Sequence, residues 1–245
     1  MGNFITVYRR ECNAYFNSPI AYILIVAFLL GMSFIFFPVL NFFGSPSPTF
    51  RAYFENFFSF CFFTLLIIPA LTMRLWAEEK KQGTIELLLT LPLKTWHVVL
   101  AKFLASYTVV GVALLLTLSV PLSINSVLAL DWGTVFTGYV GMFLIAGIVL
   151  ALGGFTSALT ENQVVGFILA VAGSGLIFFL GYPGVVSFLN DKLFGIGDFV
   201  GRFGTFTHYQ NFAKGLVSFV DLVYVFSMMG LFLLLNNIVV ESRKY

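Results

Sequence analysis

The sequence predicts an all-α integral membrane protein with six membrane-spanning helices, and three observations support this fold class. Of the 245 residues, 59% are hydrophobic and only 10% are charged, whereas a soluble domain has about 25% charged residues. The mean hydropathy is +0.97. Six separate runs are apolar and long enough to cross a bilayer, which needs about 20 residues. A soluble enzyme, a nucleic-acid-binding protein and a disordered chain are therefore excluded.

The spans are expected to carry their charged residues near their ends. Arg74, Lys102, Glu161 and Asp221 lie at such positions, where long side chains can reach the headgroups. Three prolines are expected to kink spans, namely Pro38, Pro69 and Pro121. The six spans are predicted at about residues 20–42, 57–76, 98–122, 135–158, 164–188 and 219–240, within a single domain covering residues 1–245.

Basic residues predict the orientation. If both termini are cytoplasmic, nine of the 13 Lys and Arg residues lie inside: Arg9, Arg10, Arg74, Lys80, Lys81, Lys94, Lys102, Arg243 and Lys244. The other four lie outside: Arg51, Lys192, Arg202 and Lys214. Because cytoplasmic loops of membrane proteins are enriched in Lys and Arg, both termini are predicted to be cytoplasmic.

The segment before the first span, residues 1–19, is predicted to form a helix on the inner membrane surface. Its apolar run begins too late for a cleavable signal. Aromatic residues and Cys12 recur at helical spacing, whereas Arg9, Arg10, Glu11 and Asn13 fill the other side. Ser18-Pro19 is expected to end this helix. Packing of the helix on the rest of the protein is a compatible alternative.

The last outer connection, residues 189–218, is glycine-punctuated and still apolar. Short re-entrant helices that dip partway into the bilayer would explain that composition. In the fifth span, Gly166, Ala170 and Ser174 are small residues that recur every four positions, as they do where helices pack closely. This spacing favours a packing role for the span over the active site of an intramembrane serine protease.

The chemistry of the chain predicts a non-catalytic subunit. No catalytic cluster, metal-ligand spacing or P-loop is present in the sequence, and the two histidines, His97 and His208, are expected on opposite sides of the membrane. The span centres also lack the ionisable groups that ion-coupled carriers usually need. Any energy for transport is therefore expected to come from a cytoplasmic partner.

The large cytoplasmic loop, residues 77–97, has the features of a docking element. Gly83 interrupts the preceding segment, Thr84 can cap a short helix, Glu86 lies in its first turn, and Pro92 ends it. Thr95 can then cap the third span. The apolar helix between charged flanks fits a groove on a motor protein; a self-packed interfacial hairpin is the alternative.

The stretch from Glu78 to Pro92 resembles the signature of the ABC-2-type transporter permeases. In that family it forms the coupling helix that contacts the nucleotide-binding subunit. Seven positions carry over to that coupling region by the resemblance: Glu78, Glu79, Gly83, Thr84, Glu86, Leu87 and Pro92.

A second resemblance, to the gliding-motility-associated permease subgroup, lies before the last span. It covers His208 to Gly215, Asp221 and Tyr224, with Ile68 to Arg74 at the second span. It implies a structural or gating role for His208, Gly215 and Asp221. Capping of the sixth helix is the simpler role for Asp221.

Together these resemblances imply a bacterial inner-membrane permease subunit of an ATP-driven ABC transporter, an exporter. It would form a homo- or heterodimer and work with two P-loop ATPase subunits, which would carry the ATP and magnesium. This chain would hold no cofactor and bind no nucleic acid. A periplasmic or envelope auxiliary protein is a further expected partner. The alternative is a membrane anchor that transmits ATPase-driven mechanical or regulatory signals without moving a solute. A passive channel would leave the charged loop unexplained.

Overall fold

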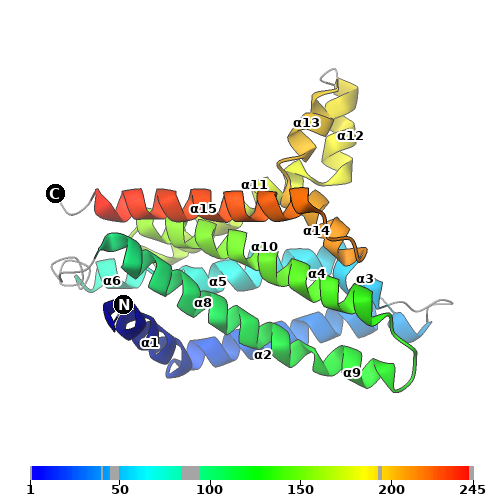
Figure 1. The fold of residues 1–245 in the computed structure, drawn as a ribbon, viewed down its shortest axis with the longest axis horizontal. Helices are drawn as coiled ribbons and strands as arrows, with labels where there is room; N and C mark the ends of the chain where they lie inside the picture. Colours follow the sequence, from blue (N-terminus) through cyan, green and yellow to red (C-terminus); the bar gives the residue numbers. More distant parts are fainter. Residues whose placement is uncertain (1, 40, 45–49, 84–93, 193–194, 243–245) are drawn as a thin grey trace.

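A computed structural model describes residues 2–39, 41–44, 50–83, 94–192 and 195–242. These residues form helices and no strand, which confirms the all-α fold class. Six helical runs are long and apolar enough to cross a membrane. They lie alongside one another, with both termini at one end of the bundle (Figure 1). We call this the terminal end and the opposite end the distal end.

The helical elements follow the chain in this order: α1 (Gly2–Phe16), α2 (Pro19–Phe34), η1 (Ile35–Val39), η2 (Phe42–Gly44), α3 (Arg51–Glu55), α4 (Phe57–Cys61), η3 (Phe62–Ile67), α5 (Ile68–Thr72), α6 (Ala77–Lys81), α8 (Thr95–Thr117), α9 (Ser119–Asn125), α10 (Trp132–Leu159), α11 (Gln163–Leu180), α12 (Pro183–Lys192), α13 (Ile196–Gly201), α14 (Thr205–Ala213) and α15 (Phe219–Glu241). The spanning runs are Pro19–Val39, Phe57–Lys81, Thr95–Asn125, Trp132–Leu159, Gln163–Leu180 and Phe219–Glu241.

Each of the three span prolines lies at an irregularity in its helix. Pro38 falls within the π-helical segment η1, and Pro69 lies at the start of α5, directly after the π-helical segment η3. α8 ends at Thr117, four residues before Pro121. In a continuous helix the ring of Pro121 would clash with the carbonyl of that residue. Each proline therefore coincides with a change of helix type or with the end of a regular α-helical segment.

Helix α10 is the centre of the bundle, and it contacts α5, α8, α11, α14 and α15. Glycines on α10 allow neighbouring elements to approach its backbone. A Cβ on Gly153 would lie 2.1 Å from Thr72 Oγ1, and one on Gly141 would lie 2.4 Å from Phe212 Cβ. α11 packs on the same helix through the predicted ladder, because Gly166, Ala170 and Ser174 are buried.

The fifth span is shorter than expected. It ends at Leu180 rather than at residue 188, and α12 starts a separate helix at Pro183. The reason is a close backbone contact: a Cβ on Gly204 would lie 2.0 Å from Gly181 N, and Thr207 Oγ1 donates to the Gly181 carbonyl at 3.1 Å. The outer connection therefore begins near residue 181, not 189.

Three helices fill this outer connection. α14 packs against α10, whereas α12 and α13 pair as a hairpin that projects sideways from the bundle near the start of α15 (Figure 1). Phe188, Ile196, Phe199 and Phe203 of this hairpin are exposed. Re-entry of these helices into the bilayer stays a prediction.

The N-terminal helix α1 packs on α8 along one side. Its buried positions include Val7 and Glu11, and Tyr8 Oη lies 2.9 Å from Thr108 Oγ1. Glu11 therefore faces the protein, not the solvent-facing side to which the sequence pattern assigned it. Thr95 was expected to cap the third span, but it is the first residue of α8 and provides no side-chain cap there.

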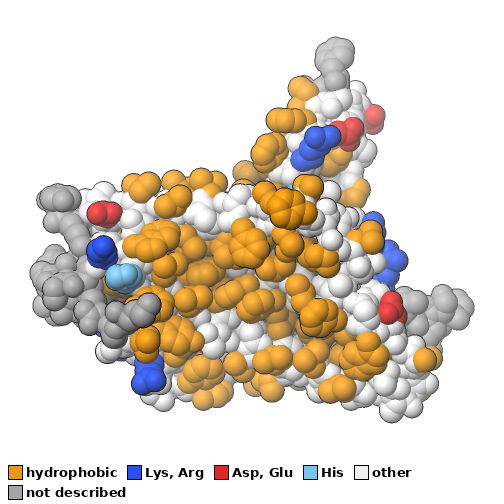
Figure 2. Space-filling view, viewed as in Figure 1, with side chains coloured by type: hydrophobic (Ala, Val, Ile, Leu, Met, Phe, Trp, Pro, Cys, Tyr) orange, Lys and Arg blue, Asp and Glu red, His pale blue; other side chains and the backbone are white. Residues whose placement is uncertain are grey.

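The surface has the distribution expected of a membrane protein. Hydrophobic side chains cover the middle of the face shown in Figure 2. Charged side chains on this face lie near the two ends of the bundle and on the projecting hairpin (Figure 2). The six spans thus form a multi-pass membrane bundle with polar ends.

Candidate functional site

The short helix α6 begins at a polar anchor on the central helix. Ser157, near the end of α10, accepts hydrogen bonds from the backbone N–H groups of Trp76 at 3.1 Å and Ala77 at 3.2 Å, and donates one to the Met73 carbonyl at 3.1 Å. Lys80 Nζ donates to the Ala158 carbonyl. The turn at 73–76 is therefore held to α10 although the two segments lie about 80 residues apart.

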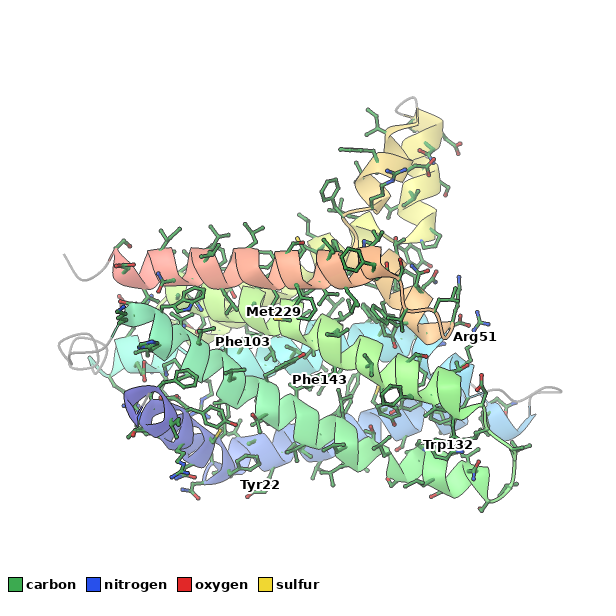
Figure 3. The ribbon with its side chains drawn as sticks, in the orientation of Figure 1. Tyr22, Arg51, Phe103, Trp132, Phe143 and Met229 are labelled. Carbon is green, nitrogen blue, oxygen red and sulfur yellow. The ribbon has the colours of Figure 1, made fainter. Side chains whose placement is uncertain are left out.

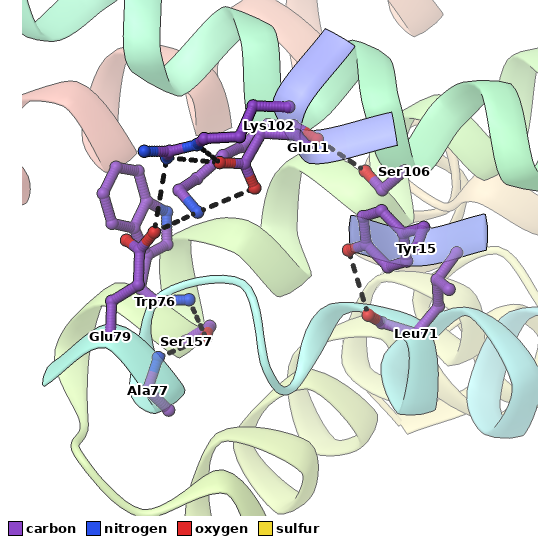
Figure 4. A network of polar contacts seen from close by, with 10 residues as sticks. Glu11, Tyr15, Leu71, Trp76, Ala77, Glu79, Lys102, Ser106 and Ser157 are labelled. Atoms are coloured by element: carbon purple, nitrogen blue, oxygen red, sulfur yellow. Dashed lines mark hydrogen bonds and ion pairs between the residues drawn. The ribbon is translucent and has the colours of Figure 1, made fainter. Parts of the chain in front are cut away.

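A buried lysine joins three helices beside this anchor (Figure 4). Lys102 of α8 has a side chain that is only 4% exposed. Its Nζ lies 2.9 Å from Glu79 Oε1 of α6 and 3.1 Å from Glu11 Oε2 of α1. The same ammonium lies 5.2 Å from the centre of the Trp76 ring, within the range of a cation–π contact.

Arg10 completes the charge balance of this cluster. Its Nη2 lies 2.6 Å from Glu11 Oε1 and 3.8 Å from Glu79 Oε1. Two cations therefore face two carboxylates, which satisfies the requirement that buried charges be paired. Burial alone would raise the pKa of Glu11, but Lys102 and the hydrogen bond from Arg10 outweigh it and hold that pKa below its usual value. We call Arg10, Glu11, Glu79 and Lys102 the lysine cluster.

The lysine cluster lines an open cavity of about 440 Å³ at the terminal end. Its other walls include Tyr15 of α1, Arg74 and Glu78. Glu78 is itself paired, with its Oε2 3.1 Å from Arg74 Nε. The cavity is thus a charged recess between α1 and the segment 74–82, open to contact from outside the bundle.

The expected coupling residues divide between described and undescribed parts of the chain. Glu79 belongs to the lysine cluster, Glu78 pairs with Arg74, and Gly83 has φ of +69° directly after α6. This left-handed backbone favours glycine and ends the helix. Thr84, Glu86, Leu87 and Pro92, with the expected helix 84–92, lie outside the described residues.

Three members of the lysine cluster, Arg10, Glu11 and Lys102, were not predicted as site residues from the sequence. Lys102 was expected to reach the headgroups, but it points into the protein. Glu11 was assigned to the polar side of its helix. A usable signal existed: Lys102 is the only Lys or Arg between Thr95 and Thr117, and Glu11 follows the buried Val7 by one helical turn.

The distal end holds a second buried polar cluster, formed by α14 and α15. His208 Nδ1 lies 2.6 Å from Asp221 Oδ1, and His208 Nε2 lies 2.9 Å from the Arg202 carbonyl. Asn211 Nδ2 donates to Asp221 Oδ2 at 3.0 Å. The Tyr224 ring stacks on the imidazole with centroids 3.9 Å apart. These contacts fasten α14 to the first turn of the sixth span.

The simpler role for Asp221, capping of the sixth helix, is corrected by these contacts. Ser218 is the N-cap of α15 and accepts from Val220 N, whereas the Asp221 carboxylate is occupied by His208 and Asn211. Gly215 has φ of +84° in the turn between α14 and α15. The resemblance thus selected three residues that the fold brings to one junction.

Comparison with known proteins identifies the family. A family model described as "ABC-2 family transporter protein" matches residues 25–239. Comparison with curated proteins gives no match. The matched region includes Glu79, Lys102, His208 and Asp221, and leaves α1 with Glu11 outside. The chain belongs to the ABC-2 family of transporter proteins.

Proposed function

We propose that this chain is the permease subunit of an ATP-driven exporter in the bacterial cytoplasmic membrane. It works as a dimer with two P-loop ATPase subunits, and its terminal end is cytoplasmic. The described basic residues support this orientation. Seven belong to the terminal end, namely Arg9, Arg10, Arg74, Lys80, Lys81, Lys94 and Lys102; four belong to the distal end, namely Arg51, Lys192, Arg202 and Lys214.

The observation that carries the proposal is the bridge from Glu79 through Lys102 to Glu11. Residues 84–92 are joined to α6 by only two residues, Gln82 and Gly83. A movement that an ATPase imposes on them reaches Glu79 first, and then α8 through the 2.9 Å contact with Lys102 and α1 through Glu11. Because Ser157 also ties the start of α6 to α10, the movement is passed to the spans themselves.

The distal cluster has the complementary role in this proposal. His208 and Asp221 hold α14 on the sixth span, and Gly215 provides the tight turn between them. A change in the packing of the spans at the terminal end is thereby coupled to the outer segment, where an exporter must open. Specific recognition of the substrate is not required for this transmission.

The test is purification of the tagged chain from its native host in mild detergent, with mass spectrometry of the co-purifying proteins. We expect a stoichiometric P-loop ATPase. The Glu86→Lys substitution, which reverses a charge in the expected coupling helix, should uncouple ATP hydrolysis from the permease without changing its folding. Glu161→Lys, a charge reversal at an exposed turn of the same end, is the matched control.

Two results would contradict the proposal. One is a chain that purifies without any ATPase under conditions that preserve other membrane complexes. The other is equal ATPase activity in complexes carrying Glu86→Lys and Glu161→Lys, which would remove residues 84–92 from the coupling route.

A further inference from the structure

An apolar groove lies on the surface between α8 and α10. It has a volume of about 510 Å³, within the range of roughly 300–1,000 Å³ found for ligand sites. Gly111 and Leu115 form one wall; Trp132, Phe136, Tyr139 and Phe143 form the other. Gly111 leaves room at the inner end, since a Cβ there would only reach contact with Phe143 at 3.4 Å.

The groove has the direction and length of one membrane leaflet. Figure 3 places Trp132 at the distal end of the bundle and Phe143 about midway along it. At about 1.5 Å per residue, the 11 steps between them on α10 cover roughly 16 Å. Half of a hydrocarbon core of about 30 Å is close to that length. Trp132 at the outer end suits the interface, where tryptophans are enriched.

A separate polar cavity of about 310 Å³ adjoins the groove at its outer end. Val135 lines both, and the polar cavity adds Arg51, Asp131 and Thr134. Arg51 lies at the same end of the bundle as Trp132 (Figure 3), with its Nη2 2.6 Å from Glu55 Oε1. Asp131 accepts from Gly133 N at 3.0 Å and from the Thr134 hydroxyl.

The charges at this outer end define what fits there. Arg51 offers a guanidinium, which binds phosphate oxygens well. Asp131 and Glu55 place two carboxylates near it, so the three groups carry a net charge of −1. A headgroup with a phosphate and a cationic amine complements this arrangement, whereas a purely anionic headgroup does not.

We propose that the groove and its outer cavity form a binding site for an amine-bearing, zwitterionic glycerophospholipid of the distal leaflet. One acyl chain lies along the groove from Trp132 towards Phe143. The phosphate contacts Arg51, and the ammonium contacts Asp131. The site is built entirely from this chain and requires neither an ATPase nor a second copy.

The test is native mass spectrometry of the full-length chain, purified in detergent and stripped of lipid. Dipalmitoylphosphatidylethanolamine is titrated, with dipalmitoylphosphatidylglycerol and dipalmitoylglycerol as comparison probes. We expect one phosphatidylethanolamine adduct that saturates before all later adducts and at lower concentration than either comparison probe. Size-exclusion chromatography and circular dichroism confirm that each variant is folded.

Filling the groove tests the acyl-chain position. Gly111→Leu and Leu115→Trp should each lower the affinity for the first bound phosphatidylethanolamine by about tenfold. This is roughly the effect of removing two buried methylene groups from the contact. The matched control is Leu234→Trp, at an exposed position of α15 elsewhere on the surface, and it should leave the adduct unchanged. If the filling and control variants changed the affinity equally, the lipid would be binding nonspecifically and the proposal would be overturned.

Two headgroup variants test the outer cavity. Arg51→Gln should lower the affinity for both phospholipids by about tenfold and leave the affinity for dipalmitoylglycerol unchanged. Asp131→Asn keeps the helix cap, because Asn and Asp cap equally well, and should abolish the preference for phosphatidylethanolamine over phosphatidylglycerol. Equal binding of the two phospholipids to the unmodified chain would overturn the assignment, as would a groove variant that alters dimer mass instead of lipid binding.

Discussion

Replacing Lys102 by methionine tests the lysine cluster most directly. The substitution removes the ammonium from a side chain that is 4% exposed and leaves two carboxylates, of Glu11 and Glu79, without their shared partner. Breaking a buried ion pair from one side typically destabilises by about 3–5 kcal/mol. Arg10 still pairs with Glu11, and the Glu79 side chain is 21% exposed. We therefore expect a loss of stability somewhat below this range, about 2–3 kcal/mol.

The loss should appear first as detachment of α1. Cys12 lies on α1 and is half-buried, whereas Cys61 lies within the second span. Maleimide should label Cys12 faster in the Lys102→Met variant, while Cys61 serves as an internal standard. Global unfolding in detergent should shift down by roughly 5–10 °C, the shift that 2–3 kcal/mol produces in a chain of this size.

Two further variants separate charge loss from poor packing. Lys192→Met removes a lysine from the exposed hairpin and should change neither readout. The triple variant Glu11→Gln, Glu79→Gln, Lys102→Met removes all the buried charges of the cluster and should recover most of the stability. Arg10 loses both carboxylates in this variant, but its side chain is 52% exposed and remains solvated. The reasoning is refuted if Lys102→Met destabilises no more than Lys192→Met, or if the triple variant is worse than the single one.

The remaining predictions concern pH, packing and the distal junction. The pKa of Glu11 is lowered in the folded chain, so its contribution to stability is present above roughly pH 4.3, the unfolded value, and is lost as the pH falls through the lower folded pKa; a chemical unfolding series against pH should flatten there in Glu11→Gln. Gly153→Ala should destabilise by about 1–3 kcal/mol because its Cβ would lie 2.1 Å from Thr72 Oγ1. Gly230→Ala, with nothing within 4 Å, should stabilise by up to about 1 kcal/mol in the same unfolding assay; the opposite order would contradict the packing of α5 on α10. Asp221→Ala should lower stability by about 1–3 kcal/mol, since it leaves buried His208 Nδ1 and Asn211 Nδ2 without their shared partner. Thermal unfolding no different from that of the exposed Asp191→Ala would contradict this role.

Much of the fold could be predicted because hydropathy and helix breaking are local properties. Each span is a continuous apolar run, so its existence does not depend on its neighbours. Pro121 acts on its own helix, and α8 ends four residues before it. The predicted end of the fifth span was wrong because it depends on a tertiary contact. The helix stops where Gly181 meets Gly204, a residue of a different turn.

The candidate sites show the same division. The resemblance selected Glu79, His208 and Asp221, and the structure supplies partners for each of them. It did not select Lys102 or Glu11. A charge near a span end can reach solvent or turn inward, and its sequence neighbours are the same in both cases.

The sequence by itself determined the membrane class, the number of spans, the loop that carries the family signature and the basic bias of one end, because each is a sum over adjacent residues. Only the tertiary structure decided which charges are paired. Lys102 meets Glu11 and Glu79 across separations of 91 and 23 residues. Such a bridge exists only when three helices converge, and the cost of leaving a buried charge unpaired then makes their arrangement specific.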